Sequence, residues 1–276
     1  MYLCELMSLR IIYTFVAILF FLVSYGQKNS KVLKSNDIES QKAKANEYYE
    51  KKKYDKAIPI YELLLTVLKG QQSVEEIYYK YAKSQYLSGS YELGAFYLKS
   101  FYNTYYNSKY TEEAAFLEAV CYYKQSPRYE LEQINTQKAI AIFQGFIDKY
   151  PKSSFMQEAN DKMDELRAKL RKKAYEGAYL YYKIGQYNAA IVALQSFMNE
   201  FPEYEDLEKI DYLIIKAHKN YADQSYKLKK RERYNEEIKA LEAFKTKYPN
   251  SKYLVELEKD NQAALSNIDK LKKENL

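Results

Sequence analysis

Apolar side chains recur at steps of three and four through most of the chain beyond residue 37, the spacing that places them along one side of a helix. The segment YYKIGQYNAAIVALQSFMNEFP (181–202) is the clearest example. Gly185 interrupts this segment and Pro202 ends it, so one helix is predicted between them and another before the glycine. The predicted stripe consists of Tyr187, Ala190, Leu194, Phe197 and Phe201.

The same pattern occurs four more times, so the chain is predicted to consist of repeated helix pairs. Each copy is the second helix of a pair, and a first helix with its own apolar stripe precedes it. Three related segments, TYYNSKY (104–110), KYPKSSF (149–155) and KYPNSKY (247–253), follow second helices and are interpreted as their ends. The five second helices carry register marks at Tyr54, Tyr91, Thr136, Tyr187 and Tyr234.

Composition favours an all-helical chain. Seven Gly and five Pro in 276 residues are too few for the many tight turns of a β-sandwich or β-barrel. An apolar content of 47% with 29% charged residues excludes the profile of a disordered segment. The chain has 33 Tyr and no Trp, so aromatic packing is expected to depend on tyrosine and phenylalanine.

This order of elements resembles the tetratricopeptide repeat. Each unit has a helix, a short turn and a second helix, with a small residue where the helices touch and an aromatic residue and a proline downstream. The first-helix Trp of that family is absent, and the marks at 54, 91, 136, 187 and 234 are 37, 45, 51 and 47 residues apart, longer than the usual repeat. Insertions around SPRYELEQINT (126–136) and YKLKKRERY (226–234) account for the extra length. The predicted fold is an all-α, tetratricopeptide-repeat-like α-solenoid of about five helix pairs.

Three segments (126–153, 164–194 and 227–253) together resemble the Bacteroidetes version of the BamD family, accessory proteins of the outer-membrane β-barrel assembly machine. The resemblance covers the chain from residue 31 onward. It implies a scaffold at the periplasmic face of the outer membrane, which binds the periplasmic domains of the barrel-forming subunit and unfolded outer-membrane protein clients. A generic periplasmic repeat adaptor for another envelope complex is the alternative.

The N-terminus has the pattern of a signal peptide over residues 1–26. Arg10 precedes an apolar run, 11–23, and the small residues Ser24 and Gly26 stand where a signal peptidase requires them. An uncleaved membrane anchor is the alternative, and Met7 is a second possible start. Residues 27–36 form a polar linker, and Ser35, Asn36 or Asp37 is expected to cap the first helix.

A lipid anchor is not available at the expected position. Leu22, Val23 and Ser24 have the residue classes that precede the lipidated cysteine of bacterial lipoproteins, but Tyr25 follows them. The family is normally lipidated just ahead of the segment KVLKS, and Cys4 lies before the apolar run. Association with the membrane is therefore expected to depend mainly on partner proteins.

Repeats one to three, residues 37–155, are expected to hold the client groove. In this type of repeat the first helices line the concave side, and the face opposite the small contact residues is rich in tyrosine and lysine. Such an aromatic groove edged with cations suits an extended chain end that bears an aromatic residue and a free carboxylate. Packing of the tyrosines between repeats is the alternative. The candidate client-binding residues are Lys42, Asn46, Tyr49, Tyr79, Lys83, Tyr86, Phe116 and Tyr123.

Repeats four and five, residues 156–276, are expected to dock a folded partner. Two basic runs, RAKLRKK (167–173) and KLKKRER (227–233), lie in this half, and the resemblance implies that it contacts the barrel-forming subunit. The candidate docking residues are Lys229, Lys230 and Arg231. A solvated helix face is the alternative for such a charge run.

The sequence gives little support to enzymatic, metal-binding or nucleic-acid-binding functions. The single histidine, His218, has no nucleophile or second ligand at helical spacing, and no glycine-rich phosphate loop occurs. The net charge of +6 is modest, and 37 acidic residues are spread through the same helices. Cys121 is interpreted as a small buried helix residue, with a reactive thiol as the alternative. We therefore expect no enzyme activity, no cofactor, no metal and no nucleic-acid partner.

Overall fold

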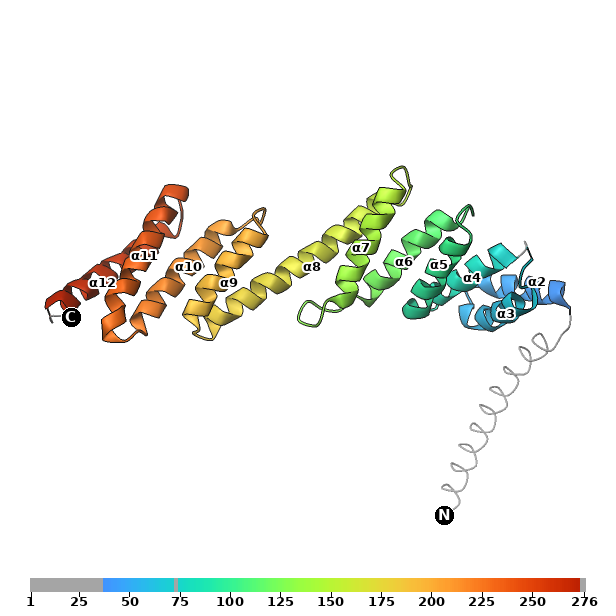
Figure 1. Cartoon of the computed structure of the whole chain (residues 1–276), viewed down its shortest axis with the longest axis horizontal. Coiled ribbons are helices and arrows are strands. Elements are labelled where there is room, and N and C mark those ends of the chain that lie inside the picture. The colour runs from blue at the N-terminus through green and yellow to red at the C-terminus, as the bar shows by residue number, and fades with distance from the viewer. Residues whose placement is uncertain (1–36, 72–73, 274–276) are drawn as a thin grey trace, which may run out of the picture. The chain divides into compact units, whose positions relative to one another are not determined.

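The computed structural model describes residues 37–71 and 74–273 (Figure 1). The predictions for the signal peptide, the linker, Cys4 and Tyr25 lie outside these residues. Within the described ranges the chain forms eleven helices and no strand. The helices are α2 (Ile38–Glu50), α3 (Tyr54–Val67), α4 (Val74–Leu87), α5 (Tyr91–Thr104), α6 (Thr111–Gln125), α7 (Ile134–Lys149), α8 (Met156–Lys183), α9 (Tyr187–Glu200), α10 (Leu207–Asp223), α11 (Lys227–Lys247) and α12 (Leu254–Lys273).

The predicted all-α, tetratricopeptide-repeat-like α-solenoid is confirmed. All five register marks lie in the second helices α3, α5, α7, α9 and α11, and each of these has a first helix ahead of it. Asp37 caps α2, because its carboxylate accepts the Ser40 amide at 3.2 Å. The helix α12 follows the fifth pair and was not assigned from the sequence.

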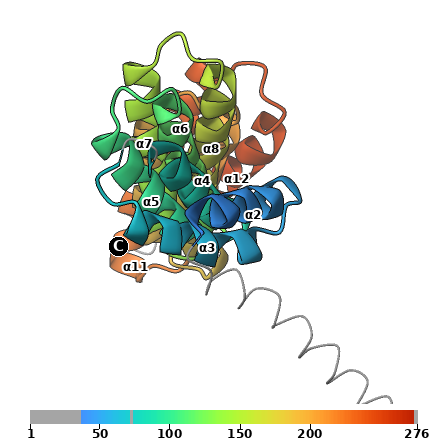
Figure 2. The same ribbon diagram turned by 90° about the vertical axis from the view of Figure 1, so that its right-hand side faces the viewer.

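The chain divides into two compact units, one up to Arg167 (unit 1) and one from Ala168 (unit 2). The division lies within α8, C-terminal to the boundary of 155/156 expected from the repeats. Within unit 1 each helix from α2 to α7 packs against the next, and α4 also contacts α6. Figure 1 and Figure 2 show α4, α5, α6 and α7 as adjacent helices. Within unit 2, α9 to α12 pack in the same order, and α10 also contacts α12.

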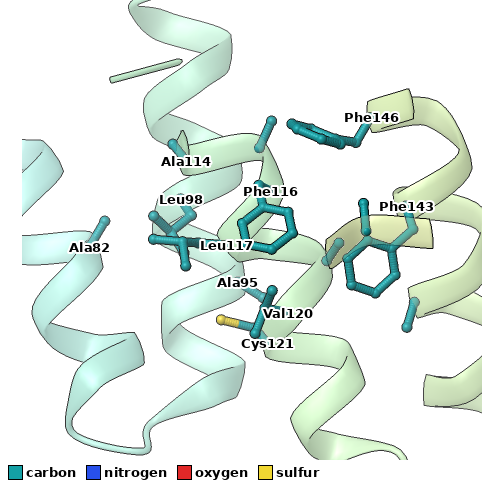
Figure 3. Packing of buried hydrophobic residues seen from close by; sticks show 14 of the residues in the cluster. Ala82, Ala95, Leu98, Ala114, Phe116, Leu117, Val120, Cys121, Phe143 and Phe146 are labelled. Atoms are coloured by element: carbon teal, nitrogen blue, oxygen red, sulfur yellow. The ribbon is translucent and has the colours of Figure 1, made fainter. Parts of the chain in front are cut away.

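The core of unit 1 contains small residues at one helix contact and large aromatic rings at another. Figure 3 shows Phe116 of α6 facing Phe143 and Phe146 of α7, with ring centroids 6.2 and 5.6 Å from that of Phe116. Ala82 and Ala95 are buried, which allows α4 and α5 to lie close together. The two helices of a pair are therefore held together by close contact of small residues in the second pair and by aromatic rings in the third.

The recurring segment after the second helices joins one helix pair to the next. Its last aromatic residue stacks face to face on an aromatic residue of the preceding first helix, and its serine accepts the backbone amide of that last aromatic residue. The stacked pairs are Tyr110 on Tyr79, Phe155 on Phe116 and Tyr253 on Tyr212, with centroids 4.3, 4.7 and 4.3 Å apart. The serines Ser108, Ser153 and Ser251 accept at 3.1, 3.0 and 3.1 Å. Tyr79, Phe116 and Tyr212 are thus equivalent positions of three repeats.

Candidate protein-binding surfaces

Two of the expected client-binding residues lie in the core of unit 1. Tyr79 is 4% exposed and Phe116 is 3% exposed, because the stacked ring of the following turn covers each of them. The expectation that these two rings face solvent is therefore wrong, and packing between repeats accounts for them. Their positions in the helical period do not predict this burial, because the residue that covers each ring lies more than 30 positions away in the chain.

Lys83 is partly exposed one turn after the buried Tyr79 on α4, and both side chains bind the same carboxylate. The Lys83 ammonium lies 2.6 Å from one oxygen of Glu113, and the Tyr79 hydroxyl donates to the other. The ammonium also lies 5.3 Å from the centre of the Tyr79 ring. Burial is the main reason that the pKa of Tyr79 is raised, and its hydrogen bond to Glu113 adds to the effect. Glu113, on α6, was not recognised from the sequence.

The first repeat contributes a second polar network. The Asn46 side-chain oxygen accepts from the Tyr61 hydroxyl at 2.9 Å and from the Lys80 ammonium at 3.0 Å. Tyr49 is partly exposed, and its ring packs edge-on against Tyr54 at 5.7 Å. Lys42, one turn before Asn46, is also partly exposed. These residues of α2 therefore lie at the surface, as expected, but the Asn46 side chain already forms hydrogen bonds within the protein.

The remaining two residues of the predicted set are also at the surface. Tyr86 is partly exposed near the end of α4, with its ring 6.1 Å from Tyr91. The Tyr123 hydroxyl donates to Glu165, and the Lys162 ammonium lies 4.7 Å from its ring. Sequence reasoning thus expected Tyr86, Tyr123 and Lys83 at the surface, where they lie, but it missed Glu113 and Glu165, which bind Lys83 and Tyr123.

Three cations of this surface pair with carboxylates. Besides Lys83 and Glu113, Lys80 lies 2.8 Å from Glu76, and Lys162 lies 3.3 Å from Glu158. A ligand with a free carboxylate would therefore have to displace Glu113 to reach Lys83. Aromatic and backbone contacts to Tyr49, Tyr86 and Tyr123 need no such exchange.

Unit 2 contains the same arrangement of tyrosine, lysine and glutamate. Tyr212 donates to both oxygens of Glu256 at 3.1 Å, and the Lys216 ammonium lies 2.9 Å from Glu256 and 2.6 Å from Asp260. The Lys216 ammonium holds the pKa of Glu256 below its usual value. The spacing could have been found in the sequence: tyrosine and lysine are four residues apart in α4 and α10, and glutamate follows the stacked tyrosine by three residues in both units.

The candidate docking residues lie at the start of α11. Lys229 and Arg231 are exposed, Lys230 is partly buried, and the Lys229 ammonium pairs with Glu232 at 2.7 Å. The neighbouring apolar residues are also exposed, Tyr226 by 90% and Leu228 by 81%. Cations and exposed apolar side chains therefore lie near one another in the chain at the start of α11.

His218 and Cys121 are two further chemically notable side chains of the described residues. Burial lowers the pKa of His218, which lines a cavity of about 430 Å³ between α9, α10 and α11. Cys121 is fully buried, as predicted, and burial raises its pKa to about 12, so the thiol is unreactive. Among the described residues no group of three or more His, Cys, Asp or Glu side chains could hold a metal ion. In the same part of the chain no helix is both long and apolar enough to cross a membrane.

A family model described as outer membrane lipoprotein, YfiO, matches residues 39–233, from the first turn of α2 into α11. No curated protein matches the sequence. Among solved structures, the complex of the TPR2AB domain of yeast Sti1 with pHSP90 is similar over 82% of this chain and 98% of that chain, with 15% identity and a TM-score of 0.39.

Proposed function

The chain belongs to the YfiO family of outer membrane lipoproteins, which includes BamD, and on this premise we propose that it is a scaffold of the outer-membrane β-barrel assembly machine. Its family and its repeat fold make it an envelope adaptor that acts through protein–protein contacts. We propose further that it acts without catalysis, at the periplasmic face of the outer membrane. The observation that supports this best is the family match over 39–233, a range that includes the candidate client-binding residues of unit 1 and the candidate docking residues of α11.

In this proposal the start of α11 binds the periplasmic domains of the barrel-forming subunit. Replacing Lys229, Lys230 and Arg231 by glutamate should abolish retention of that subunit at moderate salt. The positive charges that attract the subunit in this proposal would become negative charges that repel it. The control is the same charge reversal at the end of α12, where Lys270, Lys272 and Lys273 make the same change in net charge. Equal retention by both variants would contradict this docking site.

In this proposal the tyrosine and lysine surface of unit 1 binds unfolded clients. Replacing Lys83 and Tyr86 together by alanine should weaken binding of a peptide that ends in an aromatic residue with a free carboxylate. Tyr79 is left intact in this variant because it is part of the core. Fluorescence anisotropy with the labelled peptide measures the effect, and Lys124→Ala, at an exposed site of α6, is the control.

Glu113→Gln tests the same surface in the opposite direction. The substitution removes the carboxylate that pairs with Lys83, so a client carboxylate no longer has to displace it. We expect a severalfold gain in affinity for the free-acid peptide and no gain for its C-terminal amide. The client site is wrong if both variants bind the free-acid peptide as the unsubstituted chain does.

Co-purification distinguishes the assembly machine from another envelope complex. A C-terminally tagged chain is isolated from mildly solubilised membranes of its native host, and the proteins that remain after a salt wash are identified. Recovery of the barrel-forming subunit supports the proposal. Recovery of a different envelope complex, without that subunit, would instead favour a generic repeat adaptor.

A further inference from the structure

Two repeats carry the same lysine–tyrosine pair at the end of the second helix, but they differ in what binds it. The pairs are Lys149 and Tyr150 after α7 and Lys247 and Tyr248 after α11. The stacked residues Phe116 and Tyr212 fix the alignment of the two first helices. The residue immediately before each of them is therefore equivalent, and it is alanine in one repeat and aspartate in the other.

In unit 2 this position supplies an internal carboxylate. One oxygen of Asp211 accepts from the Lys247 ammonium at 2.8 Å and from the Tyr248 hydroxyl at 3.0 Å. The polar atoms of the lysine–tyrosine pair are thus satisfied within the repeat. Asp211 lines the same cavity as His218.

In unit 1 the equivalent residue is Ala115, and it can accept no hydrogen bond. The Tyr150 hydroxyl is buried and, within the described part of the chain, has no hydrogen-bond partner. The Lys149 ammonium lies 5.3 Å from the centre of the Tyr150 ring. A cavity of about 250 Å³ lies beside these groups, and Ala115, Lys149 and Tyr150 all line it.

We propose that this cavity of unit 1 binds the carboxylate of an aspartate or glutamate side chain from a protein partner, in the place that Asp211 occupies in unit 2. A buried hydroxyl without a partner is costly, and a hydrogen bond to a charged acceptor is among the stronger ones that proteins make. Ile142 and Phe146 also line the cavity, and their apolar surfaces would cover the methylene groups of the incoming side chain. The exposed ammonium of Lys99 adds a second cation at the rim.

One carboxylate of the protein itself lines the same cavity and has to be considered. Glu118 is 2% exposed and accepts from the Tyr102 hydroxyl at 2.6 Å, while the Lys99 ammonium lies 4.0 Å away. Burial raises its pKa, so its negative charge is already disfavoured. The Tyr102 hydroxyl donates to Glu118, whereas the Tyr150 hydroxyl donates to no group among the described residues. An incoming carboxylate would therefore accept from Tyr150 and Lys149 and would not compete with Glu118 for its donor. Glu118→Gln removes any charge that remains at this position, so the variant should bind the aspartate peptide described below at least as tightly as the unsubstituted chain does.

The test uses capped peptides and the full chain with labelled isoleucine methyl groups. The probes are Ac-Ala-Asp-Ala-NH2, the matched Ac-Ala-Asn-Ala-NH2 and sodium acetate, and the reporter is the methyl signal of Ile142. We expect the aspartate peptide to shift this signal in a saturable way and the asparagine peptide to bind at least about tenfold more weakly. Equal binding of the two peptides overturns the proposal. Acetate that binds as tightly as the aspartate peptide also overturns it, since the cavity would then be a site for small anions.

Ala115→Asp provides the decisive variant. It places in unit 1 the residue that unit 2 already has, so the new carboxylate should bind Lys149 and Tyr150 and block the aspartate peptide. Because unit 2 accommodates aspartate at this position, we expect the variant to fold, which circular dichroism checks. Peptide binding that is unchanged in folded Ala115→Asp would overturn the proposal.

A matched pair of tyrosine substitutions keeps the proposal testable if Ala115→Asp does not fold. Tyr248→Phe removes a hydrogen bond to Asp211 and should reduce hydrogen-exchange protection in α11 severalfold. Tyr150→Phe removes a hydroxyl without a partner, so protection in α7 should be unchanged or higher, while affinity for the aspartate peptide falls severalfold. Loss of protection in α7 with unchanged peptide affinity would show that Tyr150 is structural and would contradict its assignment to the site.

Discussion

Gly94→Leu should lower the free energy of unfolding of unit 1 by about 3 kcal/mol or more, at the upper end of the range for overpacked cores. Gly94 lies where α5 meets α4, and a Cβ atom there would stand 3.0 Å from the Tyr86 backbone nitrogen and 3.2 Å from the Cys121 sulfur. The nearest atom belongs to the backbone of another helix, so it cannot move aside as the end of a flexible side chain could. Chemical denaturation of the full chain, followed by signals from α4 and α5, measures the loss.

Gly145→Ala is the matched control within the same unit. Gly145 lies inside α7, and a Cβ atom there would meet no other atom within 4 Å. Replacing a helical glycine by alanine in open space should stabilise the unit by roughly 0.5–1 kcal/mol, because the unfolded chain loses conformational freedom. If the two glycine variants had similar stabilities, close contact between α4 and α5 would not be what requires glycine at position 94.

The repeated helix pairs could be predicted because their signals are local. The stripe that begins at Tyr187, the break at Gly185 and the small contact residues all lie within one or two turns of each other, and they identify the second helices. Because glycine and proline are scarce, the sequence is incompatible with most folds that need many tight turns. The partners of the surface side chains could not be predicted in the same way. Lys83 and Glu113 are 30 residues apart, and only the packing of α4 against α6 brings them together.

Burial of aromatic residues was the least predictable feature for a related reason. Tyrosine occurs on both faces of these helices, so its position in the helical period does not show whether its ring is covered. Tyr79 and Tyr86 were assigned to the same face, but only Tyr79 is covered by the aromatic residue of the next turn, Tyr110. The recurring turn segment was visible in the sequence. Its role in covering the preceding first helix became apparent only from the stacked pairs.

Glu237 departs from the repeat pattern at a position where the consequence can be measured. The equivalent residues of the other second helices are small: Ala57, Gly94, Ala139 and Ala190. Glu237 is 1% exposed, and within the described residues neither of its carboxylate oxygens has a hydrogen-bond partner. A carboxylate therefore occupies a helix contact that is otherwise made by methyl groups or by no side chain.

Its surroundings favour the protonated form. Burial raises the pKa of Glu237 to about 8, and the nearby Asp260 of α12 and Asp223 of α10 act in the same direction, while Lys219 and Lys216 oppose it. Because the folded-state pKa lies above the usual value of 4.5, the folded chain keeps a proton that the unfolded chain loses. The contribution of this group to stability is therefore fully present below about pH 4.5 and is lost as the pH rises to about 8. The loss is on the order of 4 kcal/mol.

Glu237→Gln should remove this pH dependence while keeping the shape of the side chain. We expect the variant and the unsubstituted chain to be similar in stability near pH 5, and the variant to be more stable by several kcal/mol at pH 8.5, on the order of the loss expected from linkage. The measurement is the difference between their free energies of unfolding from pH 5 to pH 8.5, followed by signals from α11 and α12. Taking the difference cancels the titration of the other groups of unit 2. A difference that stays constant across this range would contradict the raised pKa, because Glu237 would then be ionised in the folded chain at these pH values. A polar contact of the ionised carboxylate would in that case replace the small-residue contact in the fifth repeat.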